Sequence, residues 1–165
     1  MKKKVLSILI VVLLGSLLTV TTALAQAGRT SLDGTEYVSI AGSPGRVWEA
    51  DGWIQLRDAP FEGTFDFGTM SGTLSQLVNA RVNPATGEGR VWGVVTYTDS
   101  ATGITCSGIL EARLTNFLRT AKVVAPCSDG SLLKGTIQDT ELIFPPGSPA
   151  PSEVFSEFNG ELLSP

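Results

Sequence analysis

Apolar and polar side chains alternate along most of the chain, in short runs that turn signals separate. In residues 91–98 the odd positions from Val91 to Tyr97 share one face, and the even positions from Trp92 to Thr98 share the other. Segments 83–87 and 99–103 flank this run, and each begins with Asn or Asp and ends with Gly, as tight turns do. The pattern predicts β-strands joined by short turns.

Further runs and turns extend this pattern to the end of the chain. Asp51-Gly52 lies between two apolar-rich runs and suits a type I′ hairpin turn. We expect a strand over 132–144, a proline-rich loop over 145–152 and a final strand over 153–163. Glycine recurs inside the predicted strands, which indicates strong sheet curvature.

Residues 104–127 are compatible with two structures. Leu110, Leu114, Phe117 and Leu118 recur at the spacing of a helix face. Alternatively, Cys106 and Cys127 lie symmetrically about residues 116–117, as they would across an antiparallel hairpin. We favour the hairpin, because its second arm contains adjacent valines and no helix cap.

These observations predict an all-β fold, a mainly antiparallel meander that closes into a small barrel or a coiled β-sandwich. Residues 34–165 then form a single β domain, and the small and polar residues 26–33 are expected to form a loose N-terminal arm.

Residues 1–25 have the features of a cleaved secretory signal peptide. Three lysines precede an apolar run, and Ala23-Leu24-Ala25 has the small-x-small form of a cleavage site. We therefore expect a bacterial protein that is secreted or periplasmic. The apolar run is short for a membrane anchor, so no membrane association is expected after cleavage.

Charge narrows the range of partners. The full chain has a net charge of −4, and removing the three lysines of residues 1–25 leaves 9 basic against 16 acidic residues, a net charge of −7. This surface repels phosphate backbones and anionic lipids, so nucleic acid is not an expected partner.

The two cysteines are expected to form a structural disulfide, since an exported compartment is oxidising. Two free thiols are the alternative. Redox or metal-binding roles are disfavoured because 20 residues separate Cys106 from Cys127 and the chain has no histidine.

Candidates for catalysis are few. Without histidine, the usual hydrolase triads and histidine-ligated metals are excluded. Paired carboxylates remain, because Asp139 and Glu141 would share one strand face and Asp66 lies among phenylalanines. We interpret these three as ordinary polar strand positions, and we expect no catalysis, no metal and no cofactor.

The aromatic and basic residues offer better candidates for binding. Trp48 and Trp53 flank the Asp51-Gly52 turn and would face each other across a hairpin. Arg46 and Arg90 each precede a tryptophan by two residues, so they share the strand face of Trp48 and Trp92. Packed inwards, the indoles would fill the core; exposed, they would stack on a sugar or line an apolar pocket.

Residues 87–140 resemble the post-COAP-type β-domain of secreted bacterial proteins. The resemblance rests on Tyr97-Thr98-Asp99, Ala121, Asp129-Gly130 and Asp139. The glycine-rich aspartate loop of that family is replaced here by "PPGSPAPS". The resemblance implies a secreted β-domain without established catalytic residues. In strand number and glycine-bent strands, the chain is also similar to small eight-stranded ligand-binding barrels of calycin type.

The sequence thus predicts an exported, non-catalytic β-domain that acts as a structural or interaction module at the cell exterior, with a cell-envelope component as its partner. The alternative is a barrel that binds a small apolar or carbohydrate ligand, and a carboxylate-based enzyme is third. A lined cavity of several hundred Å³ would favour the ligand-binding barrel, whereas a filled interior would favour the module.

Overall fold

The computed structural model describes residues 28–43, 45–148 and 150–165, and these residues form an all-β protein. The predicted signal segment 1–25 lies outside the described residues. The strands are β1 (Arg29–Ile40), β2 (Arg46–Ala50), β3 (Trp53–Asp66), β4 (Ser71–Val82), β5 (Gly89–Asp99), β6 (Thr105–Thr115), β7 (Leu118–Pro126), β8 (Leu132–Ile143) and β9 (Glu153–Leu163).

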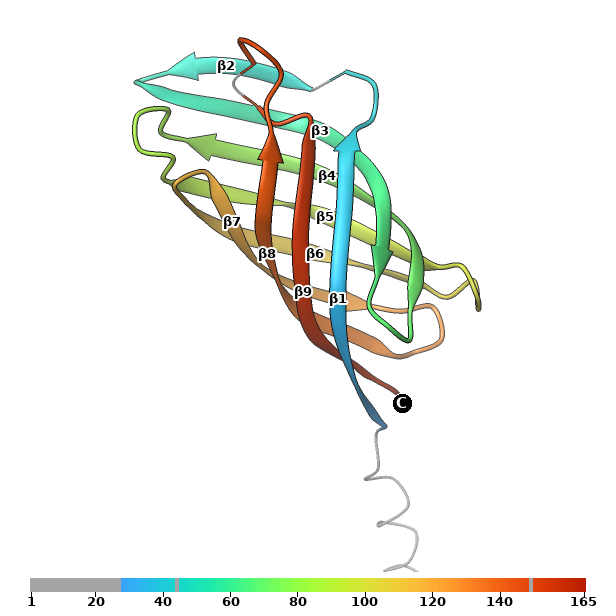
Figure 1. The fold of residues 1–165 in the computed structure, drawn as a ribbon. Helices are drawn as coiled ribbons and strands as arrows, with labels where there is room; N and C mark the ends of the chain where they lie inside the picture. Colours follow the sequence, from blue (N-terminus) through green and yellow to red (C-terminus); the bar gives the residue numbers. More distant parts are fainter. Residues whose placement is uncertain (1–27, 44, 149) are drawn as a thin grey trace, which may run out of the picture.

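Eight of these strands close into an antiparallel barrel (Figure 1). Neighbours in sequence pair from β3 to β9, then β9 pairs with β1, and β1 pairs with β3 to complete the ring. The short strand β2 lies outside the ring and pairs with the first residues of β3. The structure therefore confirms the antiparallel meander and selects the barrel over the sandwich.

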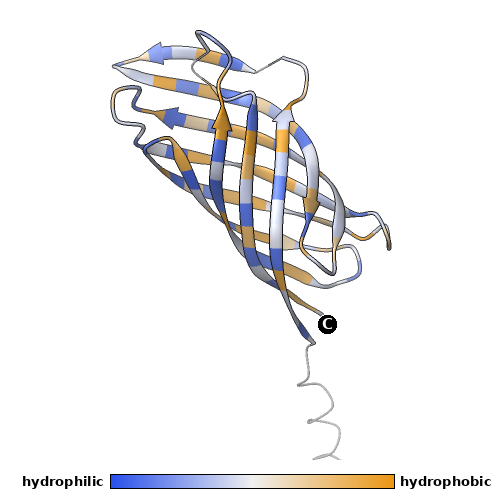
Figure 2. Cartoon of the chain, viewed as in Figure 1, coloured by the Kyte–Doolittle hydropathy of each residue, from blue (hydrophilic) through white to orange (hydrophobic). Residues whose placement is uncertain are grey.

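The barrel interior is built from the alternation seen in the sequence (Figure 2). Val91, Val95 and Tyr97 of β5 are buried inside, while Val94 on the opposite face is 53% exposed. In β7 the buried and exposed residues alternate at every position. Because a strand reverses its side chains at each residue, one face of each of the eight barrel strands points into the interior and the other forms the surface.

The hairpin predicted for residues 104–127 is confirmed, and the helix is excluded. Strands β6 and β7 pair from Ile109↔Val124 to Thr115↔Leu118, and Asn116 and Phe117 form the two-residue turn with φ of 52° and 69°. Both residues of the Asp51-Gly52 turn also have positive φ, 53° and 74°, as a type I′ turn requires.

Glycines inside the strands provide room for the curved sheet. A Cβ at Gly135 would lie 2.3 Å from the ring of Phe158, and one at Gly160 would lie 2.7 Å from the same ring. Phe158 is fully buried and stacks on Phe67 with ring centroids 4.0 Å apart. The two glycines of neighbouring strands thus form the floor on which this core ring lies.

The disulfide between Cys106 and Cys127 joins the start of β6 to the residue after β7. The bond lies at the end of the barrel opposite the Asn116–Phe117 turn. We call the end that holds the bond the disulfide end. The presence of the bond indicates an oxidising environment, because thiols are kept reduced in the cytosol.

The N-terminal boundary differs from the prediction. Residues 29–33 do not form an arm: they belong to β1, and Arg29↔Leu163 through Asp33↔Asn159 pair with β9. Backbone pairing with β9 orders this segment, and Leu32, which is fully buried, anchors it in the core. Across residues 28–43, 45–148 and 150–165 there is no helix of the length and hydropathy needed to span a membrane.

Candidate functional site

An apolar pocket lies inside the barrel, at the end opposite the disulfide. We call this the pocket end; it carries the β2–β3 hairpin, the β4–β5 and β6–β7 turns and the β8–β9 loop (Figure 1). Its walls are inward-facing side chains of neighbouring strands, among them Leu56, Val78, Ala80, Val91 and Leu114. The pocket has a volume of about 90 Å³, well below the several hundred Å³ that are typical of sites for drug-sized ligands.

Aromatic and proline side chains from two loops border the pocket. Phe117 comes from the β6–β7 turn, and Phe144, Ala150 and Pro151 come from the loop between β8 and β9. The rings of Phe117 and Phe144 meet edge to face, with centroids 6.3 Å apart, yet both residues are about 40% exposed. These side chains form a lid over the pocket, and the two phenylalanines of the lid remain partly exposed to solvent.

Phe117 adopts a backbone conformation that is unfavourable for its residue type. Its φ of 69° lies in the left-handed region, where glycine or asparagine is the usual residue at this turn position. A bulky residue there stores about 1–3 kcal/mol of strain. The turn places the ring against the pocket, so the strained residue is also a lid residue.

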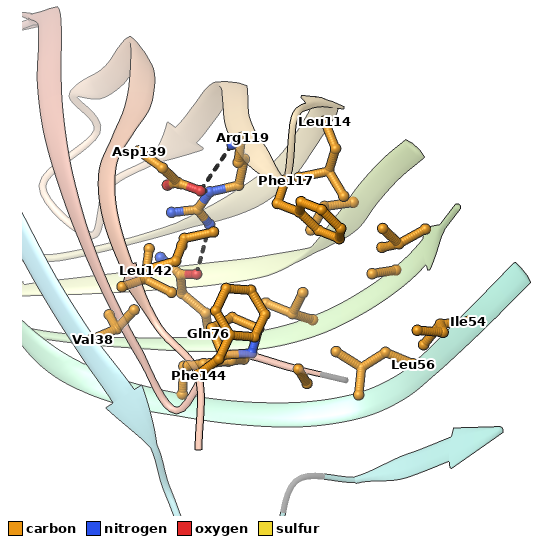
Figure 3. A pocket seen from close by; sticks show the side chains of 18 residues that line it. Val38, Ile54, Leu56, Gln76, Leu114, Phe117, Arg119, Asp139, Leu142 and Phe144 are labelled. Atoms are coloured by element: carbon orange, nitrogen blue, oxygen red, sulfur yellow. Dashed lines mark hydrogen bonds and ion pairs between the residues drawn. The ribbon is translucent and has the colours of Figure 1, made fainter. Parts of the chain in front are cut away.

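Polar side chains form the deep side of the pocket (Figure 3). Arg119 of β7 points inwards and donates from Nε to Oδ1 of Asp139 on β8, at 3.0 Å. Its other nitrogens donate to Oε1 of Gln76 at 3.2 Å and to Oγ of Ser156 at 3.3 Å. Ser156 in turn donates to Asp139 at 2.9 Å. Four strands thus contribute to one buried network that balances the guanidinium charge.

One donor of this network has no partner. Gln76 is 4% exposed and lines the pocket, and its Oε1 accepts from Arg119, so the amide nitrogen Nε2 must occupy the other position. Among the described residues, Nε2 has no hydrogen-bond partner. A buried amide donor without a partner costs about 1–3 kcal/mol, which a ligand with an acceptor atom would recover.

A second buried pair lies further along the interior. The hydroxyl of Tyr97 donates to Oε1 of Glu36 at 2.6 Å, and Oε2 of Glu36 has no partner among the described residues. Burial raises the pKa of Glu36 above its ordinary value of 4.5, while the Arg119 charge and the Tyr97 hydroxyl oppose the rise. Burial and the neighbouring Glu36 raise the pKa of Tyr97 well above 10.0.

Sequence reasoning missed Arg119, Gln76 and Glu36 as interior residues. Each lies on the buried face of its strand. Arg119 shares that face with Ala121 and Val123 in β7, Gln76 with Leu74 and Val78 in β4, and Glu36 with Val38 in β1. The signal in the sequence that could have identified them is a charged or amide side chain at a position that alternation assigns to the buried face of a strand.

The predicted carboxylate pair is wrong. A β-bulge between Asp139 and Glu141 shifts the register, so Asp139 points into the barrel while Glu141 is exposed. Asp66 is exposed and accepts a hydrogen bond from the backbone of Gly68. Within the part of the chain that the structure describes, no three potential ligand side chains cluster as a metal site would require.

The tryptophans lie on the outer surface at the pocket end. Trp48 is 42% exposed, and it is not opposite Trp53 as expected: it pairs with Gln55, so the two indoles are diagonal neighbours. Trp53 and Trp92 are half-buried and line one groove on the outside of the barrel.

The structure separates the two predicted arginines. Arg90 lies in the groove with Trp53 and Trp92, whereas Arg46 pairs with exposed Asp58, Nη2 to Oδ2 at 3.2 Å. The cation that stacks on Trp92 is Arg57, with its guanidinium carbon 4.9 Å from the ring centroid.

Comparisons with protein-family models, with curated proteins and with solved structures give no match for this chain.

Proposed function

We propose that the protein is an exported, non-catalytic binding module whose barrel holds the apolar end of a small ligand in the pocket. The observation that carries the proposal is the amide of Gln76, which has no partner among the described residues and lies on the polar deep side of a pocket whose other walls are apolar. An apolar cavity with one correctly placed polar group is the usual form of a site that orients a ligand.

The pocket does not reach the several hundred Å³ that would favour a barrel enclosing a whole ligand, so we restrict the proposal to the end of a ligand. A cavity of about 90 Å³ accommodates the end of an alkyl chain rather than a whole drug-sized molecule. A larger ligand enters when Phe117 and Phe144 move aside, and their partial exposure means that this movement breaks few buried contacts.

The polar groups favour a neutral acceptor on the ligand. Asp139 already compensates the Arg119 charge, and Glu36 is shifted towards its neutral form. The free donor is the amide of Gln76, which binds an alcohol, ether or carbonyl oxygen without introducing a further charge. An unpaired carboxylate or ammonium in this interior would instead be penalised by desolvation.

Export and the absence of catalysis rest on separate support. Residues 1–25 have the form of a signal peptide, and the disulfide fits an oxidising compartment. The network carboxylate Asp139 is engaged by Arg119 and Ser156, and no histidine is available to act as a base.

The test is calorimetric titration with straight-chain alcohols from 1-butanol to 1-octanol, together with carboxylates and amines of the same lengths. We expect saturable binding of the alcohols, with affinity rising about fourfold per methylene until the pocket is full, since each buried methylene contributes about 0.8 kcal/mol. The charged analogues should bind more weakly.

Two variants on one strand provide the matched control. Val91→Phe fills the pocket from β5 and should abolish alcohol binding, whereas Val94→Phe adds the same ring on the outer face and should leave it unchanged. No saturable binding by the parent, or equal binding by Val91→Phe, would overturn the proposal.

A second candidate is the interaction module at the cell exterior. It is favoured by a row of exposed apolar residues in register across four strands, Leu77↔Val94, Val94↔Ile109 and Ile109↔Val124. The partner that covers this row would be a second copy of the chain, because two straight apolar rows can pack against each other. Self-association in sedimentation that is lost in Ile109→Lys, with no alcohol binding by the parent, would select this function.

A further inference from the structure

Three arginines form a row on the outside of the barrel at the pocket end. Arg81 of β4 pairs with Arg90 of β5, and Arg90 pairs with Arg113 of β6, so the three occupy directly opposite positions on adjacent strands. All three are exposed. Adjacent strands are about 4.8 Å apart, which places the outer two arginines about 10 Å from each other.

No arginine of the row forms an ion pair within the described residues. The ion pairs found there involve Arg29, Arg46, Arg119 and Lys134, and none involves Arg81, Arg90 or Arg113. Like charges directly opposite on adjacent strands destabilise a sheet. In a chain with a net charge of −4, such a row is unexpected unless an anion binds it.

Two indoles and one carboxylate line a groove together with Arg81 and Arg90. The groove is lined by Trp53, Arg81, Gly89, Arg90, Trp92 and Glu111 and has a volume of about 680 Å³, and Arg113 lies outside this lining, opposite Arg90 on β6. Arg81 stacks on Trp53 with its guanidinium carbon 4.6 Å from the ring centroid, which fixes both side chains along the groove wall. Glu111 pairs with Trp92 across β5 and β6 and provides the only acceptor carboxylate of the groove lining.

We propose that this groove binds an acidic polysaccharide, a sugar chain that carries carboxylate or sulfate groups. The arginine row takes the anionic groups, and the exposed parts of Trp53 and Trp92 take the apolar faces of sugar rings. Glu111 accepts hydrogen bonds from sugar hydroxyls, which polyphosphates lack. This site lies on the outer surface and is independent of the interior pocket.

The test is titration with polygalacturonate, followed by indole fluorescence and calorimetry at several salt concentrations. The comparison polymers are neutral dextran, which lacks the charges, and polyphosphate, which lacks the rings. Vesicles of phosphatidylglycerol and phosphatidylcholine form a further arm. We expect saturable, salt-sensitive binding of polygalacturonate and no binding of dextran.

Two triple variants with the same change of charge locate the site. The variant with Arg81→Gln, Arg90→Gln and Arg113→Gln should weaken polygalacturonate binding by about tenfold or more and reduce its dependence on salt. The control with Arg29→Gln, Lys122→Gln and Lys134→Gln removes three charges outside the row and should bind nearly as the parent does. Thermal melting checks that both variants fold.

Three outcomes would overturn the proposal. The first is the absence of saturable polygalacturonate binding by the parent, and the second is an equal loss in both triple variants. The third is tighter binding of polyphosphate or of the anionic vesicles, which would assign the row to phosphate rather than to a saccharide. Loss of affinity in Trp53→Leu, in a variant that melts as the parent does, would support the stacking of a sugar ring.

Discussion

Arg119 and Asp139 form an ion pair inside the barrel, with Nε and Oδ1 3.0 Å apart and side-chain exposures of 6% and 3%. The pair is also bound through the backbone, since the amide of Arg119 donates to Oδ2 of Asp139 at 3.0 Å. The carboxylate of Asp139 on β8 thus accepts three hydrogen bonds from the two flanking strands, two from Arg119 on β7 and one from Ser156 on β9.

Removing one member of this pair should strongly destabilise the barrel. We expect Asp139→Asn to lower the free energy of unfolding by about 3–5 kcal/mol, because the guanidinium of Arg119 is then buried without a counter-charge. Urea denaturation measures this. The double variant Arg119→Met with Asp139→Leu should lose much less, and an equal or larger loss would show that the network itself is required for folding.

The disulfide should stabilise the protein without shaping the site. We expect Cys106→Ser with Cys127→Ser to lower the free energy of unfolding by about 3 kcal/mol, since the bridge closes a loop with a sequence separation of 21. The pocket lies at the other end of the barrel, so alcohol binding should persist. Intact mass after alkylation without reductant checks the bridge, and two alkylated cysteines in the exported protein would contradict it.

Glu36 should make stability fall as pH rises. Burial raises the pKa of Glu36 above 4.5. The stability that the neutral carboxyl group contributes is therefore fully present below pH 4.5 and is lost as pH rises through the folded-state pKa. Glu36→Gln lacks this loss, so its stability relative to the parent should increase as the pH rises above 4.5. Thermal melts at several pH values measure the difference between the two.

Tyr97→Phe tests the link between the pKa of Glu36 and stability by raising that pKa, whereas Glu36→Gln removes the titrating group. The Tyr97 hydroxyl lowers the pKa of Glu36 by donating to its carboxylate, so its removal should raise that pKa further. The loss of stability should then extend to higher pH than in the parent. A difference between parent and Glu36→Gln that is constant with pH would contradict the assignment.

Phe117 should control access to the pocket rather than stability. Phe117→Gly relieves the strain of a positive φ but loses the ring contact with Phe144, so we expect a net change within about 1 kcal/mol. Alcohol should associate and dissociate faster, as measured by stopped-flow mixing. Asn116→Gly alters the same turn while keeping the ring, and it should leave both rates unchanged.

The alternation of side chains determined the strands and their order. Asp51-Gly52 and the Asn83–Gly87 and Asp99–Gly103 segments marked the turns, because each required positive φ or local side-chain hydrogen bonds. Consecutive hairpins leave only one antiparallel meander, and the cysteines removed the remaining ambiguity in the β6–β7 hairpin. These are local properties, which a sequence carries directly.

Closure of the ring and the contents of its interior were decided by the tertiary structure. Pairing of β1 with β3 joins residues that no local pattern relates, and it distinguishes the barrel from a sandwich. The bulge between Asp139 and Glu141 reverses the face of every later residue in β8, so a strict period of two placed Glu141 incorrectly. Gln76, Arg119 and Asp139 meet only because the barrel curves three separate strands around one space.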